Sequence, residues 1–346
     1  MMDKAFYGSL TRIADLGTWP VEMEPQDKGV WRNGDYAVAE VLEVSYPAER
    51  LELIDGRDVE LTVGDWLIGA LGVRAATLEA TGSWRDVEAD MILHSLTGAG
   101  LLGRLTSKSA LAPHLAKVRY LGHVMVDGRP SNMLDWVAEV EERPIASPVV
   151  LVIGTSMSAG KTLSARKIIR QLRKLDMTVV GAKLTGAGRW RDVLSMRDAG
   201  ASEIFDFVDV GLPSTIVEEK LFRTATRGLL SRIASAEADV IVAEAGASPL
   251  EPYNGGTAIE MLKGKTAFTL LCASDPYAAR GIMEAFGILP DLVAGPAANT
   301  LAGARLVERL CGVPALNLLE TDTEPALLAM LRDVLCSERS PGIGAA

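Results

Sequence analysis

The sequence contains few of the residues that build disulfide frameworks or metal centres. Its 346 residues include three cysteines and three histidines. The cysteines lie far apart, and neither set has the short spacing of metal ligands. No apolar run approaches the roughly 18 residues needed to cross a bilayer, and the first residues lack the apolar core of a signal peptide. We therefore expect a soluble protein of the reducing cytoplasm, without disulfides.

Positive charge is also scarce. The chain has 35 Lys+Arg against 45 Asp+Glu, a net charge of −10. This balance excludes a broad, sequence-independent grip on nucleic acid. The hydrophobic content of 48% and charged content of 23% are typical of folded globular proteins. At about 100–200 residues per domain, the length predicts two domains.

The negative charge is concentrated in the first part of the chain. Residues 1–148 hold 14 Lys/Arg and 23 Asp/Glu, a net of −9, and the remainder holds 21 and 22, a net of −1. The change occurs across residues 141–148, where two prolines and several charges indicate a linker. We predict a first domain over residues 1–143, a second over 149–335, and a frayed tail over 336–346.

The first domain has the pattern of a small β structure of unassigned role. Residues 36–44 alternate apolar and polar side chains, as a half-buried strand does. Asp55-Gly56 between two short apolar runs predicts a hairpin. Further strands are expected over 65–73 and 118–126, with a helix over 109–116. Short strands with frequent turns predict a small barrel or sandwich.

The second domain alternates buried strands with helices. The continuous apolar run over 149–153 predicts a strand covered on both faces. Further strands are expected over 177–182, 240–243, 266–272 and 291–294. Helical spacing of apolar residues separates them over 162–175, 214–236 and 300–310. This alternation predicts an α/β fold, a parallel P-loop sheet flanked by helices, with the smaller β-rich domain at the N-terminus.

The strongest motif follows the first of these strands and opens a helix. It is the run Gly154, Thr155, Ser156, Met157, Ser158, Ala159, Gly160, Lys161 and Thr162. Small residues let successive backbone N–H groups face an anion, and the helix N-terminus adds partial positive charge. Lys161 would reach the β/γ-phosphates and Thr162 would ligate Mg²⁺. Five residues separate Gly154 from Gly160, whereas the common P-loop has four.

This longer loop resembles that of dethiobiotin synthetase and its relatives, in which G-T-x-x-x-x-G-K-T is a typical form. The resemblance covers residues 149–317 and implies ATP and Mg²⁺ as ligands. It also implies that Lys183, after the second strand, faces the acceptor, and that Asn299 hydrogen-bonds adenine. Asn299 could instead cap the helix that follows it. Glu244-Ala-Gly-Ala is similar to the Glu-Gly-Ala-Gly of that family.

A second resemblance rests on short strings around Lys183–Gly186, Arg197–Ala201 and Asp206–Gly211. These strings are similar to a group of bacterial P-loop proteins that includes the D-glutamate N-acetyltransferase type. That resemblance implies an acyltransferase on a small amino acid, with the loop holding the phosphates of acetyl-CoA. It is confined to the C-terminal domain.

Polar residues at the ends of the predicted strands complete the candidate site. Open α/β sheets bind ligands at the carboxyl ends of their strands, where Lys183, Thr185, Arg189 and Arg191 would meet an anionic substrate. Glu244 is the candidate catalytic carboxylate and metal ligand, because it ends an apolar strand. The other candidates are two competing metal carboxylates, Asp192 and Asp198, and three substrate contacts, Glu251, Tyr253 and Asn254.

These features predict an enzyme that uses Mg²⁺-ATP to activate a carboxylate or carbamate of a small molecule, as a ligase or transferase. Catalysis would come from Lys161, Lys183 and Glu244. The alternatives are the acetyl-CoA-dependent acyltransferase and a nucleotide-dependent switch that binds a protein partner. We expect a small-molecule substrate, no nucleic acid or membrane partner, and a homo-oligomer such as a dimer.

Overall fold

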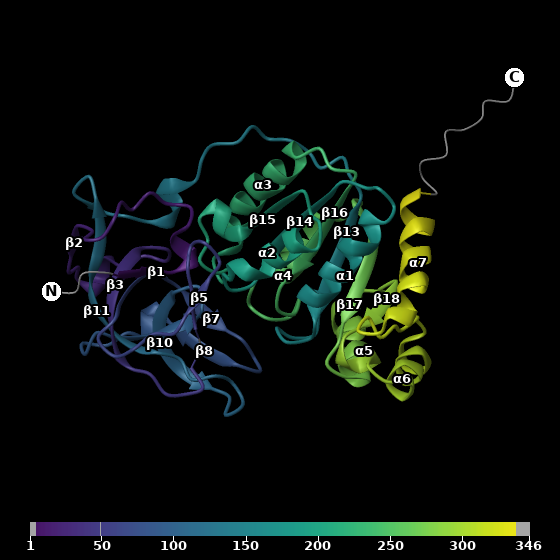
Figure 1. The fold of residues 1–346 in the computed structure, drawn as a ribbon, viewed down its shortest axis with the longest axis horizontal. Helices are drawn as coiled ribbons and strands as arrows, with labels where there is room; N and C mark the ends of the chain where they lie inside the picture. The colour runs from purple at the N-terminus through teal and green to yellow at the C-terminus, as the bar shows by residue number, and fades with distance from the viewer. Residues whose placement is uncertain (1–4, 49, 337–346) are drawn as a thin grey trace, which may run out of the picture.

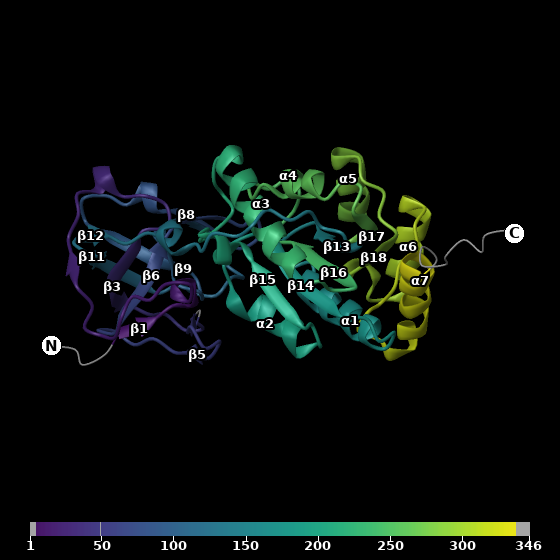
Figure 2. The ribbon, with the colours of Figure 1, turned by 90° about the horizontal axis from the view of Figure 1, so that it is seen from above.

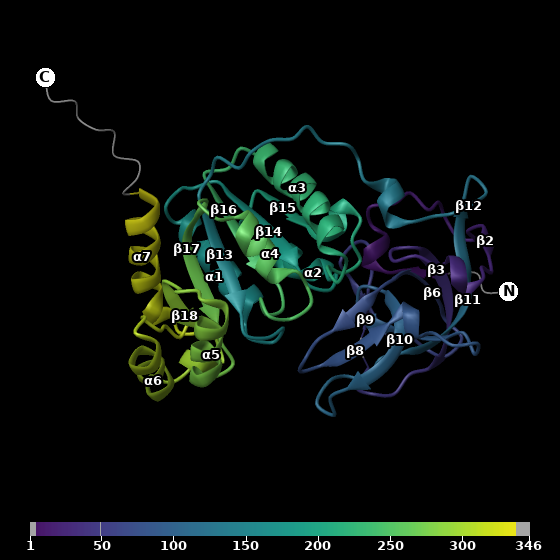
Figure 3. The same cartoon turned by 180° about the vertical axis from the view of Figure 1, so that it is seen from behind.

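The computed structural model describes residues 5–48 and 50–336, which form a β-barrel unit and an α/β unit (Figure 1). Residues 137–148 connect the two units without helix or strand, and the predicted linker lies within this stretch. The barrel unit lies at one end of the molecule and the last helix at the other, as the view from behind shows (Figure 3). Within the described part of the chain, no helix has the length and apolarity needed to cross a membrane.

Twelve short strands make up the described part of the barrel unit. They are β1 Ala5–Tyr7, β2 Met23–Glu24, β3 Tyr36–Glu43, β4 Leu51–Glu52, β5 Asp58–Val59, β6 Trp66–Leu71, β7 Val73–Ala75, β8 Ala80–Ser83, β9 Ile92–Thr97, β10 Leu101–Lys108, β11 Lys117–Val126 and β12 Arg129–Pro130. The main sheet runs β1-β6-β3-β11-β9-β10-β8-β7, and β10 also pairs with β6. The pairing therefore returns on itself, and β6, β3, β11, β9 and β10 close a barrel.

Strand β3 is covered on both faces. Ala37, Ala39 and Val41 point to the barrel interior with Leu67 and Leu93. The alternate residues Tyr36 and Val38 belong to a core that continues into the α/β unit. Because successive side chains of a strand point to opposite faces, one strand contributes to both cores and joins the two units.

The helix predicted over residues 109–116 is wrong. The segment forms turns, in which the Ala112 N–H donates to Ser109 O at 3.2 Å and the His114 N–H donates to Pro47 O at 3.0 Å. Pro113 has no N–H and its ring clashes with the preceding turn of a helix. His114 instead forms an isolated bridge with Ala48.

The α/β unit is a parallel sheet with the order β15-β14-β16-β13-β17-β18. Its strands are β13 Val149–Gly154, β14 Val179–Thr185, β15 Glu203–Asp206, β16 Val240–Ala245, β17 Thr266–Cys272 and β18 Leu292–Ala294. Its helices are α1 Lys161–Arg173, α2 Trp190–Asp198, α3 Glu219–Ser235, α4 Gly255–Met261, α5 Pro276–Phe286, α6 Leu301–Cys311 and α7 Glu324–Cys336. The predicted α/β class is confirmed. Of the predicted tail, residues 337–346 lie outside the described residues.

Alternate residues of the central strand β13 face two helical layers. Leu151 and Ile153 pack in one core with Phe222 of α3, and Val152 packs in the other with Ile168 of α1. Figure 2 shows α3, α4 and α5 on one side of the sheet and α1, α2 and α7 on the other. This double coverage explains why the strands are continuous apolar runs in the sequence.

Candidate functional site

The candidate site lies at the carboxyl edge of the parallel sheet. Strands β13, β14 and β16 are neighbours, and the register pairs Glu244 of β16 with Val152 on one side and Lys183 on the other. The phosphate loop leaves the end of β13, and α2 follows β14. Three segments distant in sequence therefore converge where open α/β sheets place ligands.

The loop of residues 154–160, the candidate phosphate loop, joins β13 to the start of α1. Gly160 precedes α1 with φ of +94°, a left-handed conformation that L side chains rarely adopt. Lys161 and Thr162 form the first turn of α1, where backbone N–H groups have no acceptor within the helix. The Lys161 side chain lies back across the loop, and its Nζ donates to Ser156 O at 2.6 Å. The helix thus presents backbone donors beside a buried ammonium group.

Thr162 and Glu244 form the second part of the site. Thr162 Oγ1 donates to Glu244 Oε2 at 3.1 Å, and the Glu244 side chain is 2% exposed. Burial raises the pKa of Glu244, and the positive charge of Lys183 opposes this shift. Burial lowers the pKa of Lys161, and the Glu244 carboxylate opposes that shift. The arrangement places a hydroxyl and a carboxylate oxygen together next to the loop lysine.

Lys183 and Asp192 form a buried ion pair beside Glu244. Lys183 lies near the end of β14 and Asp192 lies in the first turn of α2, which brings the ammonium and the carboxylate into contact. Burial acts to lower the pKa of Lys183, but the Asp192 and Glu244 carboxylates outweigh it and raise the pKa. Burial acts to raise the pKa of Asp192, and Lys183 outweighs it in the opposite direction. Both groups are therefore held in their charged forms.

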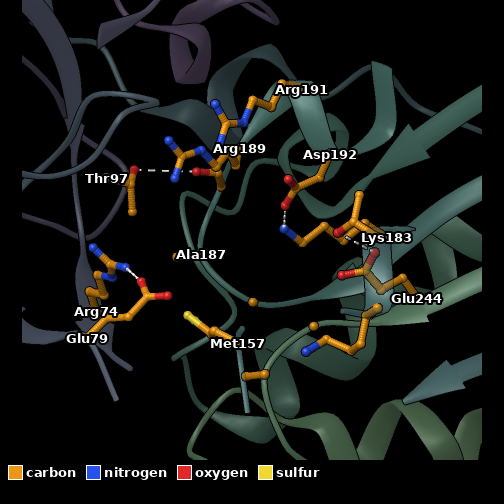
Figure 4. Close-up of a pocket in the computed structure, with 16 residues that line it drawn as sticks. Arg74, Glu79, Thr97, Met157, Lys183, Ala187, Arg189, Arg191, Asp192 and Glu244 are labelled. Carbon is orange, nitrogen blue, oxygen red and sulfur yellow. Dashed lines mark hydrogen bonds and ion pairs between the residues drawn. The ribbon is translucent and has the colours of Figure 1, made fainter. Parts of the chain in front are cut away.

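These residues line a cavity of about 160 Å³ between the two units (Figure 4). Its charged residues are Arg74, Glu79, Lys161, Lys183, Arg189, Arg191, Asp192 and Glu244. Five cations face three carboxylates, so the wall carries a net positive charge even though the protein is acidic. Such a surface favours a ligand with several negative charges.

The two competing candidates for a second metal carboxylate lie at different places on α2. Asp192 lines the cavity, but its carboxylate is paired with Lys183. Asp198 is the last residue of the helix, is exposed, and does not line the cavity. Within the described residues, no three His, Cys, Asp or Glu side chains gather as a group able to hold a metal. The Thr162 hydroxyl and the Glu244 carboxylate therefore remain as a pair of candidate oxygen ligands beside the loop.

The predicted substrate contacts after β16 have protein partners. Glu251 Oε1 accepts hydrogen bonds from the Thr77 N–H at 3.1 Å and the Thr77 hydroxyl at 2.8 Å. The buried Tyr253 hydroxyl accepts the Ala75 N–H at 2.8 Å. Asn254 Nδ2 donates to Thr215 O at 2.8 Å and Val217 O at 3.0 Å. Glu251 and Tyr253 therefore bind the barrel unit to the α/β unit, whereas Asn254 makes its hydrogen bonds within the α/β unit.

Two further predicted contacts lie beside the cavity rather than in it. Thr185 is buried, and its hydroxyl donates to Gly246 O at 2.9 Å. Asn299 is exposed and does not line the cavity, and α6 is capped by Thr300, whose side chain accepts the Gly303 N–H. The interpretation of Asn299 as the cap of this helix is therefore wrong. Its proposed contact with adenine stays a prediction.

Sequence reasoning missed the contribution of the barrel to the cavity. Arg74 and Glu79 lie across the cavity from Lys183 and Glu244 (Figure 4). Arg74 is 7% exposed and lies between Val73 and Ala75 in strand β7. A charged residue between apolar residues of a strand was the signal in the sequence that could have indicated this contribution, because buried charges require partners.

Neither the family models nor the curated proteins compared with the sequence contain a match. Among solved structures, HypB from Helicobacter pylori in complex with nickel aligns at 14% identity and a TM-score of 0.37, over 57% of this chain and 92% of that one. A DUF1611 family protein from Anabaena variabilis aligns at 15% identity and a TM-score of 0.37, over 58% of this chain and 62% of that one. The 54 kDa signal recognition particle protein from Aeropyrum pernix, in complex with GDP, aligns at 17% identity and a TM-score of 0.36, over 60% of this chain and 51% of that one.

Proposed function

We propose that this chain is a Mg²⁺- and nucleoside-triphosphate-dependent enzyme that transfers the γ-phosphoryl group to an anionic small molecule. The observation that carries the proposal is the convergence, in one cavity, of the phosphate loop, the Thr162–Glu244 pair and a separate set of cations after β14. A binding-only phosphate site would need the first of these features but not the other two.

The residues of the loop fit a polyphosphate. The buried Ser156 Oγ has no hydrogen-bond partner among the described residues, and Lys161 Nζ has a backbone oxygen as acceptor where a phosphate oxygen would be the stronger one. The N–H groups at the start of α1 would bind the same phosphates. A ligand with phosphate oxygens would thus satisfy donors that the protein leaves incompletely used.

The residues beside the loop also fit Mg²⁺. This ion prefers oxygen ligands and is commonly held by one or two carboxylates together with substrate phosphates and waters. The Thr162 hydroxyl and the Glu244 carboxylate are such ligands and lie 3.1 Å apart. When bound, Mg²⁺ would neutralise charge on the phosphates.

The cations after β14 would hold the acceptor. Arg189 and Arg191 line the cavity on the side opposite Met157 of the loop, and Lys183 lies beside Glu244 (Figure 4). They would bind a carboxylate or carbamate and neutralise charge as the phosphoryl group moves. The bond from the γ-phosphorus to the leaving diphosphate breaks while a bond to the acceptor oxygen forms. The products are a nucleoside diphosphate and an acyl phosphate, which an amine can capture with release of phosphate.

The test is phosphate release by the full chain with Mg²⁺-ATP or Mg²⁺-GTP, with and without a panel of small carboxylic acids and amines. We expect slow release that at least one acid accelerates, and loss of that acceleration in Arg189→Ala. Binding of acetyl-CoA in place of either triphosphate would support the acyltransferase alternative. Triphosphate hydrolysis that no small molecule changes would contradict phosphoryl transfer to an acceptor.

A further inference from the structure

The hairpin formed by β7 and β8, residues 73–83, belongs to the barrel but docks on the α/β unit. Val73–Ala75 pairs with Thr81–Ser83 in antiparallel register. The two strands lie on the side of the barrel that faces the α/β unit (Figure 1). The hairpin is therefore placed to connect the barrel with the cavity.

One side of the hairpin is fixed by the loop of residues 248–256. Tyr253 accepts a hydrogen bond from Ala75 and is fully buried. Glu251 accepts hydrogen bonds from Thr77 and is 8% exposed. Hydrogen bonds between buried groups resist rearrangement, because breaking one leaves a desolvated polar group without a partner. The hairpin and this loop consequently form one unit.

The tip of the hairpin reaches the phosphate loop. Glu79 Oε1 accepts a hydrogen bond from the Ser158 hydroxyl at 2.8 Å, and Glu79 Oε2 pairs with the guanidinium of Arg74. Arg74 also donates to Leu96 O, while its buried Nε has no partner among the described residues. The cavity thus contains an almost fully buried arginine whose donors are only partly used, next to the loop that would hold phosphates.

We propose that Arg74 binds the terminal phosphate of the nucleoside triphosphate, so that the barrel detects through this hairpin whether a γ-phosphate is present. The inference rests on the proposed function. The guanidinium binds phosphate oxygens with a pair of parallel hydrogen bonds, which suits a terminal phosphate better than a single carboxylate. Without nucleotide, Glu79 neutralises Arg74 and contacts Ser158. With triphosphate bound, the phosphate competes with Glu79 for Arg74 and repels its carboxylate.

This arrangement also gives the barrel a role in the chemistry. A phosphoryl group in transfer carries its charge on the oxygens that Arg74 would contact, so the same side chain would stabilise the transition state. After transfer the γ-phosphoryl is gone, and Glu79 recovers both Arg74 and the Ser158 hydroxyl. The Glu79 side chain at the tip of the fixed hairpin would therefore take different positions before and after the reaction.

The test compares binding of the non-hydrolysable analogue Mg²⁺-AMP-PNP with that of Mg²⁺-ADP, or the guanine pair, by calorimetry on the full chain. We expect Arg74→Ala to weaken AMP-PNP binding about tenfold or more and to change ADP binding less than twofold, as expected for loss of a charge-assisted contact. Glu79→Gln is expected to tighten AMP-PNP binding about threefold, because a competing charge is removed. The control is Arg119→Ala. It removes another arginine of the barrel, whose guanidinium pairs with the Glu40 carboxylate at 2.6 Å and does not line the cavity.

The outcomes separate this inference from the proposed function. If the wild type binds no nucleotide, the proposed function fails and the inference fails with it. If the wild type binds both nucleotides while Arg74→Ala keeps their affinity ratio within twofold, the inference alone is overturned. Should Arg74→Ala not fold, Arg74→Lys decides the question, since it keeps a charge without the guanidinium geometry. An unchanged ratio in that variant is equally contradictory.

Discussion

Glu52 of the barrel accepts the backbone N–H of Trp190 at 2.7 Å, across the boundary between the two units. Its second oxygen accepts the Arg191 N–H at 2.8 Å, so the carboxylate caps the start of α2. A negative charge at this position also interacts favourably with the helix dipole. Asp192, the partner of Lys183, lies in the same helical turn. The barrel therefore fixes the end of the helix that carries part of the candidate site.

Glu52→Gln should lower the free energy of unfolding by about 1–3 kcal/mol, because an amide cannot accept hydrogen bonds with both of its terminal atoms. Urea unfolding followed by tryptophan fluorescence measures the change. Glu60→Gln removes an exposed ion pair with Arg50 on the same unit and should cost less than about 1 kcal/mol. Equal losses in the two variants would mean that the cap contributes nothing beyond surface charge.

Glu244→Gln should reduce the gain in nucleotide affinity that Mg²⁺ provides, by about tenfold, because an amide is a poorer ligand for this ion than a carboxylate. Affinity without Mg²⁺ should stay equal or rise, since a negative charge near the phosphates is lost. Thr162→Ser keeps the hydroxyl and serves as the control. A Glu244→Gln protein with the same Mg²⁺ dependence as wild type would exclude Glu244 as a metal ligand.

Lys183→Met should lower acid-stimulated turnover by about 10²–10³ with little change in triphosphate affinity, as expected when one transition-state donor is removed. The substitution leaves the partly buried Asp192 carboxylate without its lysine partner, which should lower the free energy of unfolding by about 3 kcal/mol or less. The double variant Lys183→Met/Asp192→Leu should regain stability but not turnover. Recovery of turnover in the double variant would assign Lys183 a structural role only.

The free energy of unfolding of Asp209→Asn, relative to that of the wild type, should increase as the pH rises. Burial, together with neighbouring Asp206, raises the pKa of Asp209 to about 6, and Arg12 opposes the shift. A carboxyl whose folded pKa is above its unfolded value binds more protons in the folded state, so stability falls as pH rises from about 4 to about 6. The asparagine variant lacks this loss. Urea unfolding at pH 4.5 and pH 7 should show the difference between variant and wild type moving in favour of the variant, and a constant difference would contradict the assignment.

The sequence predicts the α/β unit better than the barrel, for a physical reason. Parallel strands covered on both faces are continuous apolar runs, and the prediction for residues 266–272 matches β17 at both ends. The short strand β15 was missed, since two of its four residues, Glu203 and Asp206, are acidic. The candidate phosphate loop can be proposed from the sequence because its residues are nine consecutive positions that join a strand to a helix.

Contacts between units could not be derived in this way. Glu251 and Tyr253 were expected to meet substrate, yet they hold a hairpin that precedes them by about 175 residues. Arg74 and Glu79 reach the cavity only because the barrel closes and docks. The hydrogen bond between Ser158 and Glu79 is a property of tertiary structure, and no local pattern in the sequence predicts it.

Thermal unfolding of the full chain with Mg²⁺-ATP and Mg²⁺-GTP tests whether the loop of residues 154–162 binds the phosphates of a nucleotide. A ligand at 100 times its dissociation constant should add about 2.7 kcal/mol to the stability of the wild type. Lys161→Ala should lose this gain, while Lys174→Ala, on the exposed end of the same helix, should keep it. An unfolding temperature that neither nucleotide raises, or one raised equally in Lys161→Ala, would exclude a nucleotide phosphate site at this loop.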